Sequence, residues 1–86
     1  MPSQIYLDHN ASTPVAPEVT AVMLQSVDTA YGNPSSGHWA GWPARGMIEA
    51  ARREVANLLA CAPHEIILTS GGSEANNLAL KGAFFR

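Results

Sequence analysis

The sequence of 86 residues holds a single cysteine, Cys61, and a single lysine, Lys81. One cysteine excludes an internal disulfide, which fits a reducing compartment. Charged residues make up only 14% of the chain, and the formal net charge of −2 comes with no basic block. We therefore expect neither nucleic acid nor an anionic membrane as a partner. So little charge also indicates that some faces of the chain are covered by other protein.

Long apolar runs and targeting signals are missing too. Uninterrupted apolar stretches are short, such as residues 21–24, and none approaches the length that spans a bilayer. Residues 1–8 contain neither the basic segment nor the apolar core of a secretory signal. We therefore expect a cytoplasmic protein with no membrane contact. A chain of this length forms one small domain at most and buries only about 60–65% of its unfolded surface.

Apolar residues recur at helical spacing in three segments. Pro17 suits the first turn of a helix that Gly32 would end near Tyr31. A longer helix is expected from about Trp42 to Ala60, because a proline at position 43 is tolerated only in a first turn. A third helix is expected over about 73–85.

The long helix has two predicted faces. Its apolar face comprises Ala44, Met47, Ile48, Ala51, Val55, Leu58 and Leu59. Its outer face carries Arg45, Glu49 and Arg53, which lie four residues apart and can form ion pairs.

Two short segments are predicted to be strands. Ile66–Leu68 is apolar at consecutive positions, which is typical of a strand buried on both faces inside a parallel sheet. Ile5–Leu7 is a short N-terminal strand, far away in sequence. Because no further strand flanks residues 66–68, the chain reads as the front end of a larger α/β protein. A complete helical mini-domain is the alternative.

The segment Ser70-Gly71-Gly72-Ser73 joins the apolar run to the third helix. A glycine turn that opens a helix can bind an anion, because the free N–H groups of the first turn point along the positive end of the helix dipole. Ser73 adds a hydroxyl donor, and the expected ligand is a phosphate group. The same residues also suit a plain turn with a helix cap, and the spacing matches neither common nucleotide-binding loop.

Other reactive side chains give weaker signals. His9, His38 and His64 have no metal-ligand spacing, so no metal site is expected. Cys61 follows an apolar helix end, where an inert thiol is expected. Lys81 lies about two turns into the third helix, away from the glycine turn, and is poorly placed to bind a cofactor covalently.

Several motifs together resemble one family. They are Tyr6–Val15, Tyr31–His38, Ala51-Arg52, Val55-Ala56 and Glu65–Gly82. In order and spacing these motifs resemble the matching stretches of cysteine desulfurases, class V aminotransferase-like enzymes that bind pyridoxal phosphate. The resemblance extends from Ile5 to Gly82 and matches only the N-terminal part of that family's pattern.

The resemblance implies a fold. Residues 1–86 would be the N-terminal part of an α/β large domain of the aspartate aminotransferase-like type (pyridoxal-phosphate fold type I), with no complete domain. This part would be mostly helical, with one buried parallel strand and a short N-terminal strand.

The resemblance also implies a function. Members remove sulfur from L-cysteine to give L-alanine and an enzyme persulfide, which serves iron–sulfur cluster assembly or tRNA thiolation through sulfur-acceptor proteins. Gly72 and Ser73 would bind the phosphate of pyridoxal 5′-phosphate, and Asn10 and Ala11 would line the substrate pocket. A full-length member would form a homodimer.

The chain departs from the family where the chemistry is done. The family's Schiff-base lysine and nucleophilic cysteine align with no residue here, and Cys61 does not match that cysteine. No catalytic residue is therefore assigned, and we expect this chain alone to be inactive. Two alternatives stay open: a non-enzymatic remnant or protein-interaction module, and a sister lyase such as selenocysteine lyase.

Overall fold

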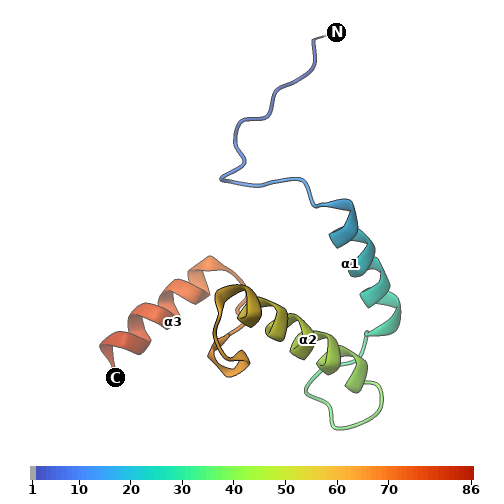
Figure 1. Ribbon diagram of the computed structural model, residues 1–86, viewed down its shortest axis with the longest axis vertical. Coiled ribbons are helices and arrows are strands. Elements are labelled where there is room, and N and C mark those ends of the chain that lie inside the picture. Colours follow the sequence, from blue (N-terminus) through green and yellow to red (C-terminus); the bar gives the residue numbers. More distant parts are fainter. Residues whose placement is uncertain (1) are drawn as a thin grey trace. The chain divides into compact units, whose positions relative to one another are not determined.

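The computed structural model describes residues 2–86, and its regular structure is helical (Figure 1). Helix α1 covers Pro17–Thr29, α2 covers Trp42–Leu59 and α3 covers Gly72–Phe84, with a 3-10 turn at Pro63–Glu65. Residues 2–86 contain no β-strand. The chain divides into two compact units, of which the first ends at Arg45 and the second is Gly46–Arg86.

Proline places the start of the first two helices. α1 begins at Pro17, and Pro43 is the second residue of α2. A first-turn position suits proline because its missing N–H would have no helical acceptor there. The three predicted helices are confirmed, and each end lies within two residues of its predicted position.

Between α1 and α2 the chain closes a loop on itself at two glycines. A Cβ on Gly32 would lie 1.7 Å from the carbonyl oxygen of Ala40, and a Cβ on Gly41 would lie 2.4 Å from that of Asn33. Real side chains cannot make either contact, so only glycine fits at both positions. We call residues 32–41 the glycine-necked loop, a compact surface loop whose two ends meet.

Hydrogen bonds fix the interior of the glycine-necked loop. The Ser36 N–H donates to the Asn33 carbonyl and the Gly41 N–H to the His38 carbonyl, each at 3.0 Å, so two tight turns follow one another. From the first turn of α2, the Arg45 Nε donates to the Pro34 carbonyl at 2.9 Å. Arg45 therefore binds the loop, and its predicted ion pair with Glu49 is not formed.

The residue that follows α2 has a left-handed backbone conformation. Ala60 has a φ of 54°. Its N–H donates to the Asn57 carbonyl at 3.2 Å, and the Cys61 N–H donates to the Ala56 carbonyl at 3.0 Å. This pair of bonds is the Schellman motif, in which glycine is usual at the left-handed position.

Replacing Ala60 with glycine is expected to raise the free energy of unfolding by about 0.5–1 kcal/mol, because relief of the Cβ clash outweighs the added freedom of the unfolded chain. Thermal unfolding followed by circular dichroism measures the change. Ala50→Gly is the control inside α2 and should lower stability by about 1 kcal/mol. A loss of stability in both variants would contradict the strain at Ala60.

The two predicted strands are not confirmed. Ile66 has an extended backbone, with φ −93° and ψ 122°, but Ile66–Leu68 pairs with no other segment in residues 2–86, and Ile67 is 66% exposed rather than buried. Ile5–Leu7 is likewise unpaired and exposed. A strand exists only through ladder hydrogen bonds to a neighbour, and the described part of the chain provides none.

A side chain of α2, rather than a neighbouring strand, forms a hydrogen bond with the backbone of the extended segment. The Arg52 guanidinium donates from Nη1 to the Ile66 carbonyl and lies 3.4 Å, Nε to Oε1, from Glu49. Glu49 therefore pairs with Arg52 three residues on, and the predicted pairing with Arg53 is wrong. Through Arg52, α2 holds the extended segment that leads to α3.

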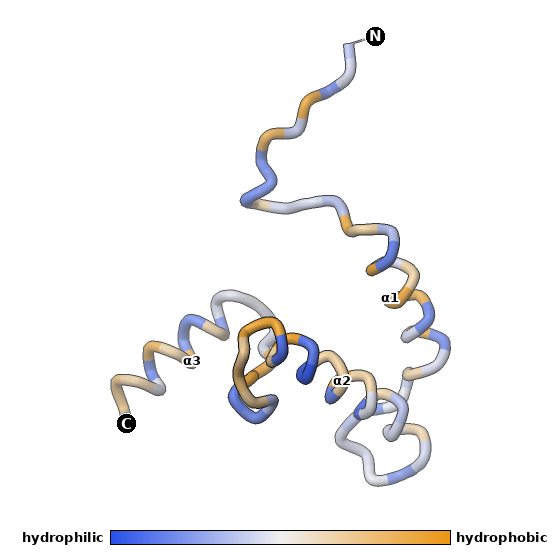
Figure 2. The backbone as a smooth tube through the Cα atoms, viewed as in Figure 1, coloured by the Kyte–Doolittle hydropathy of each residue, from blue (hydrophilic) through white to orange (hydrophobic). Residues whose placement is uncertain are grey.

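The residues described have almost no hydrophobic core. Ala44 and Ala56 are the buried apolar residues, and Ala56 is not on the predicted apolar face. Large apolar residues are exposed on each of the three α-helices and in the segment before α3. Figure 2 shows how the apolar residues are distributed along the backbone.

Candidate functional site

The N-terminus of α3 presents backbone N–H groups without a protein acceptor. Gly71 is the N-cap residue and makes no side-chain cap. The first hydrogen bond of the helix runs from the Ala75 N–H to the Gly71 carbonyl at 3.1 Å. Within the described chain, the N–H groups of Gly72, Ser73 and Glu74 therefore have no acceptor. Three free donors at the positive end of a helix dipole attract an anion.

The Glu74 side chain turns back from α3 onto Ser70. One carboxylate oxygen, Oε2, accepts the Ser70 hydroxyl at 2.5 Å and the Ser70 N–H at 3.1 Å. The hydrogen bond from the Ser70 hydroxyl, and to a smaller extent the one from the Ser70 N–H, lowers the pKa of Glu74. The carboxylate is therefore ionised at neutral pH. The Thr69 hydroxyl donates to the Gly71 carbonyl at 3.0 Å. Side chains on both sides thus hold the turn and leave the three helix N–H groups free.

The two glycines of the turn face open space. A Cβ on Gly71 or Gly72 would meet nothing within 4 Å, and Ser73 is exposed. The φ of 166° at Gly71 is extended backbone that any residue adopts. Neither conformation nor contacts within the second unit require glycine here, in contrast to Gly32 and Gly41.

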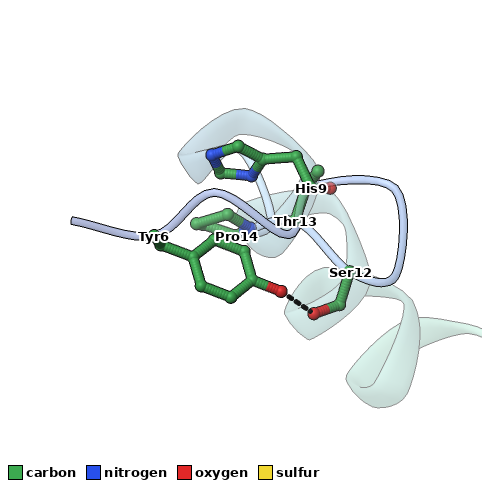
Figure 3. Close-up of a pocket in the computed structure, with 5 residues that line it drawn as sticks. All are labelled: Tyr6, His9, Ser12, Thr13 and Pro14. Carbon is green, nitrogen blue, oxygen red and sulfur yellow. Dashed lines mark hydrogen bonds between the residues drawn. The ribbon is translucent and has the colours of Figure 1, made fainter.

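A second candidate site lies in the loop before α1 (Figure 3). Tyr6, His9, Ser12, Thr13 and Pro14 line an open depression of about 370 Å³. The Tyr6 hydroxyl donates to the Asp8 carbonyl at 2.9 Å and lies 2.8 Å from the Ser12 hydroxyl. Because a phenol has only one proton to donate, the Ser12 hydroxyl donates to Tyr6.

The depression has an aromatic wall. The rings of Tyr6 and His9 meet edge to face, with centroids 4.8 Å apart. The Ala11 and Ser12 N–H groups donate to the Asp8 carbonyl, at 3.0 and 3.3 Å, which closes the turn between the two sides of the depression. An imidazole and three hydroxyl-bearing side chains can bind a small polar ligand by hydrogen bonds.

The structure places the sequence-predicted site residues in both units. Gly72 and Ser73 are the first two residues of α3, at the free N–H groups. Asn10 and Ala11 lie in the turn after Asp8 and are exposed, while their neighbours line the depression. The sequence analysis did not select Tyr6, His9 or Ser12. Their signal was the run of turn-forming residues over 8–14, which begins two residues after Tyr6.

A protein-family model described as aminotransferase class-V matches residues 5–85. The chain belongs to the class-V aminotransferase family. Curated relatives share about half of its residues. A cysteine desulfurase of Frankia sp. is 53% identical over 78 residues, which cover 91% of this chain and 19% of the relative. The mitosomal cysteine desulfurase of Encephalitozoon cuniculi is 51% identical over 80 residues, with coverage of 92% and 18%.

A selenocysteine lyase of Xenopus tropicalis is 48% identical over 80 residues, with coverage of 93% of this chain and 19% of the relative. This class-V aminotransferase chain therefore spans about a fifth of the length of the curated relatives it matches. No solved structure matches it significantly. The predicted resemblance to cysteine desulfurases is confirmed, and the family fits an α/β fold that binds pyridoxal phosphate.

The remaining reactive side chains of this class-V aminotransferase chain lie apart from both candidate sites in sequence. His38 lies in the glycine-necked loop, where its Nδ1 accepts the Ala40 N–H at 3.3 Å. Cys61 is half-buried at the C-terminus of α2, and His64 lies exposed in the 3-10 turn. Across residues 2–86, no three His, Cys, Asp or Glu side chains form a group that could hold a metal ion, and no helix is long and apolar enough to cross a membrane.

Proposed function

We propose that this chain supplies the phosphate anchor, and one wall of the substrate pocket, of a cysteine desulfurase that uses pyridoxal phosphate. The enzyme would convert L-cysteine to L-alanine, hold the sulfur as a persulfide and pass it to acceptor proteins, working as a homodimer. The single observation that carries the proposal is the set of three free N–H groups at the start of α3 in a chain about half identical to cysteine desulfurases.

The residues present fit a phosphate. The N–H groups of Gly72, Ser73 and Glu74, together with the Ser73 hydroxyl, offer four donors to the three terminal oxygens of a phosphate ester. Neither glycine has a side chain to occupy the open space in front of them. Pyridoxal phosphate, when bound, supplies an electron sink for chemistry at the amino-acid substrate. The work of these residues is to bind and orient it.

We propose that the loop before α1 lines a pocket for the amino-acid substrate. Asn10 and Ala11 form the turn, and the depression beside them brings together Tyr6, His9 and Ser12. Their hydroxyl and imidazole groups can form hydrogen bonds with a small polar amino acid. The Tyr6–Ser12 bond restricts both side chains, which reduces the entropy lost when a ligand binds.

Lys81 and Cys61 are not proposed for the chemistry. Lys81 lies eight residues after Ser73 in the same helix, which is about 12 Å along the axis at 1.5 Å per residue. It belongs to the last turn of α3, whereas the anchor lies at the first turn of the same helix. Cys61 is half-buried beside the α2 cap, where its N–H is used by the Schellman motif.

Removing the Ser73 hydroxyl is expected to weaken binding of pyridoxal phosphate about tenfold, because one donor to a charged group is lost. A fluorescence titration of the protein, as its gene encodes it, measures the Kd. The unsubstituted protein should bind pyridoxal phosphate more tightly than pyridoxal, and inorganic phosphate should compete. Ser3→Ala removes an exposed hydroxyl without a recorded contact and should leave the Kd unchanged. Equal affinity for pyridoxal and its phosphate would contradict the anchor.

Selenocysteine lyase is the second candidate, because a protein of that name matches as much of the chain as the desulfurases do. Both activities would use the same phosphate anchor, so the test is the substrate. We expect alanine to form from L-cysteine. Alanine formed from L-selenocysteine but not from L-cysteine would favour the lyase.

A further inference from the structure

The Glu74 carboxylate occupies an unusual place for an acidic residue in the first turn of a helix. In a capping box, the third helical residue accepts the N–H of the N-cap residue itself. Here Glu74 reaches one residue further, past Gly71, and takes both the N–H and the hydroxyl of Ser70 on one oxygen. The helix N–H groups, which a first-turn carboxylate could also have accepted, stay free.

We propose that Glu74 is a positioning residue for the phosphate anchor, which fixes Ser70 against α3 and so holds the Gly71-Gly72 turn open. This inference rests on the proposed anchoring role of Gly72 and Ser73. It assigns different roles to the two serines of the turn. The Ser73 hydroxyl contacts phosphate, whereas the Ser70 hydroxyl forms a hydrogen bond with Glu74. The two bonds restrain a turn in which neither glycine has a side chain that packs.

Simple electrostatics makes the opposite prediction. A negative carboxylate in the first turn repels a bound phosphate, so removal of its charge should tighten phosphate binding. If Glu74 positions the anchor, removal of its charge should instead weaken binding, because a charge-assisted bond between Glu74 and Ser70 is replaced by a weaker neutral one. The two interpretations therefore differ in the sign of the effect.

The experiment compares Glu74→Gln, Ser70→Ala and the double variant in the protein as its gene encodes it. The probe is pyridoxal phosphate, with pyridoxal as the ligand that lacks the phosphate. We expect each single variant to raise the Kd of pyridoxal phosphate about three- to tenfold, and the double variant to match Glu74→Gln, since the two residues act through one contact. The Kd of pyridoxal should not change, and the phosphorus NMR resonance of the bound ligand should shift.

Glu18→Gln is the matched control. Glu18 is likewise an acidic residue in the first turn of a helix, but it makes no side-chain hydrogen bond in the described chain. Its substitution should leave both Kd values unchanged. If Glu74→Gln loses its helical circular dichroism, Ser70→Ala decides instead.

Three results would overturn the positioning role. Tighter or unchanged binding of pyridoxal phosphate by both single variants would overturn the positioning role of Glu74 but not the phosphate anchor itself. An equal loss of affinity for pyridoxal would show a general structural effect. Failure of the unsubstituted protein to prefer pyridoxal phosphate over pyridoxal would remove the anchor and this inference together.

Discussion

Replacing Gly32 with alanine is expected to lower the free energy of unfolding of the first unit by about 3 kcal/mol, the upper range for overpacking. The added Cβ would lie 1.7 Å from the Ala40 carbonyl oxygen and 2.4 Å from its carbon. Both atoms belong to the backbone, so no side-chain rotation relieves the clash. The two ends of the glycine-necked loop must separate instead.

Separation of the loop ends has a local signature. The Ser36 and Gly41 N–H groups bond within the loop, so their amide hydrogens should exchange with solvent more than tenfold faster in Gly32→Ala, which follows from opening that costs less free energy. Gly37→Ala is the matched control, because a Cβ on Gly37 in the same loop meets nothing within 4 Å. Equal exchange rates in the two variants would show that the glycine neck does not hold the loop.

Local structure was predictable from sequence because its causes are local. Pro17 and Pro43 place helix starts through the geometry of a single residue. The ends of α2 and α3 follow from hydrophobic spacing over a few turns. A resemblance carried by several short motifs was enough to identify the family, since the order and spacing of motifs are also properties of sequence.

Contacts between distant residues were not predictable. Nothing in the sequence pairs Gly32 with Ala40 or Arg52 with Ile66, because neither periodicity nor composition reports which backbone atoms meet. The consecutive apolar residues at 66–68 correctly indicated an extended segment at Ile66, but pairing into a strand needs a neighbour that residues 2–86 do not provide. The apolar face of α2 was assigned by spacing, yet Ala56, which is not on that face, is buried near the end of the helix, where the Cys61 N–H donates to its carbonyl.

In the candidate site, too, local features were predictable from the sequence and side-chain contacts were not. The glycine turn and Ser73 were identifiable because strand-like and helix-like patterns meet there. The contact of Glu74 had a signal in the sequence, an acidic residue three positions after the N-cap, but only the structure shows that its partner is Ser70. At the other candidate site, the Tyr6–Ser12 bond depends on the turn that Asp8 closes.

Replacing Arg52 with methionine is expected to destabilise the second unit by about 1.5–3 kcal/mol, the cost of losing a hydrogen bond from a charged donor to a carbonyl. Methionine keeps most of the apolar length of the side chain, so the change isolates the guanidinium. The Arg52 side chain is 23% exposed, which limits solvent screening of its bond to Ile66. The Glu65 and Ile66 N–H groups, which bond within the 3-10 turn, should exchange at least tenfold faster.

Two further variants separate the contacts of Arg52. Glu49 is about half exposed, so Glu49→Gln should cost less than about 0.5 kcal/mol, as for an exposed ion pair. Arg53→Met removes a neighbouring arginine that has no recorded contact in residues 2–86 and should change almost nothing. If Glu49→Gln were as damaging as Arg52→Met, the ion pair rather than the Ile66 carbonyl would hold the segment. Because that segment leads directly into the Gly71-Gly72 turn, Arg52→Met alone should also loosen binding of pyridoxal phosphate.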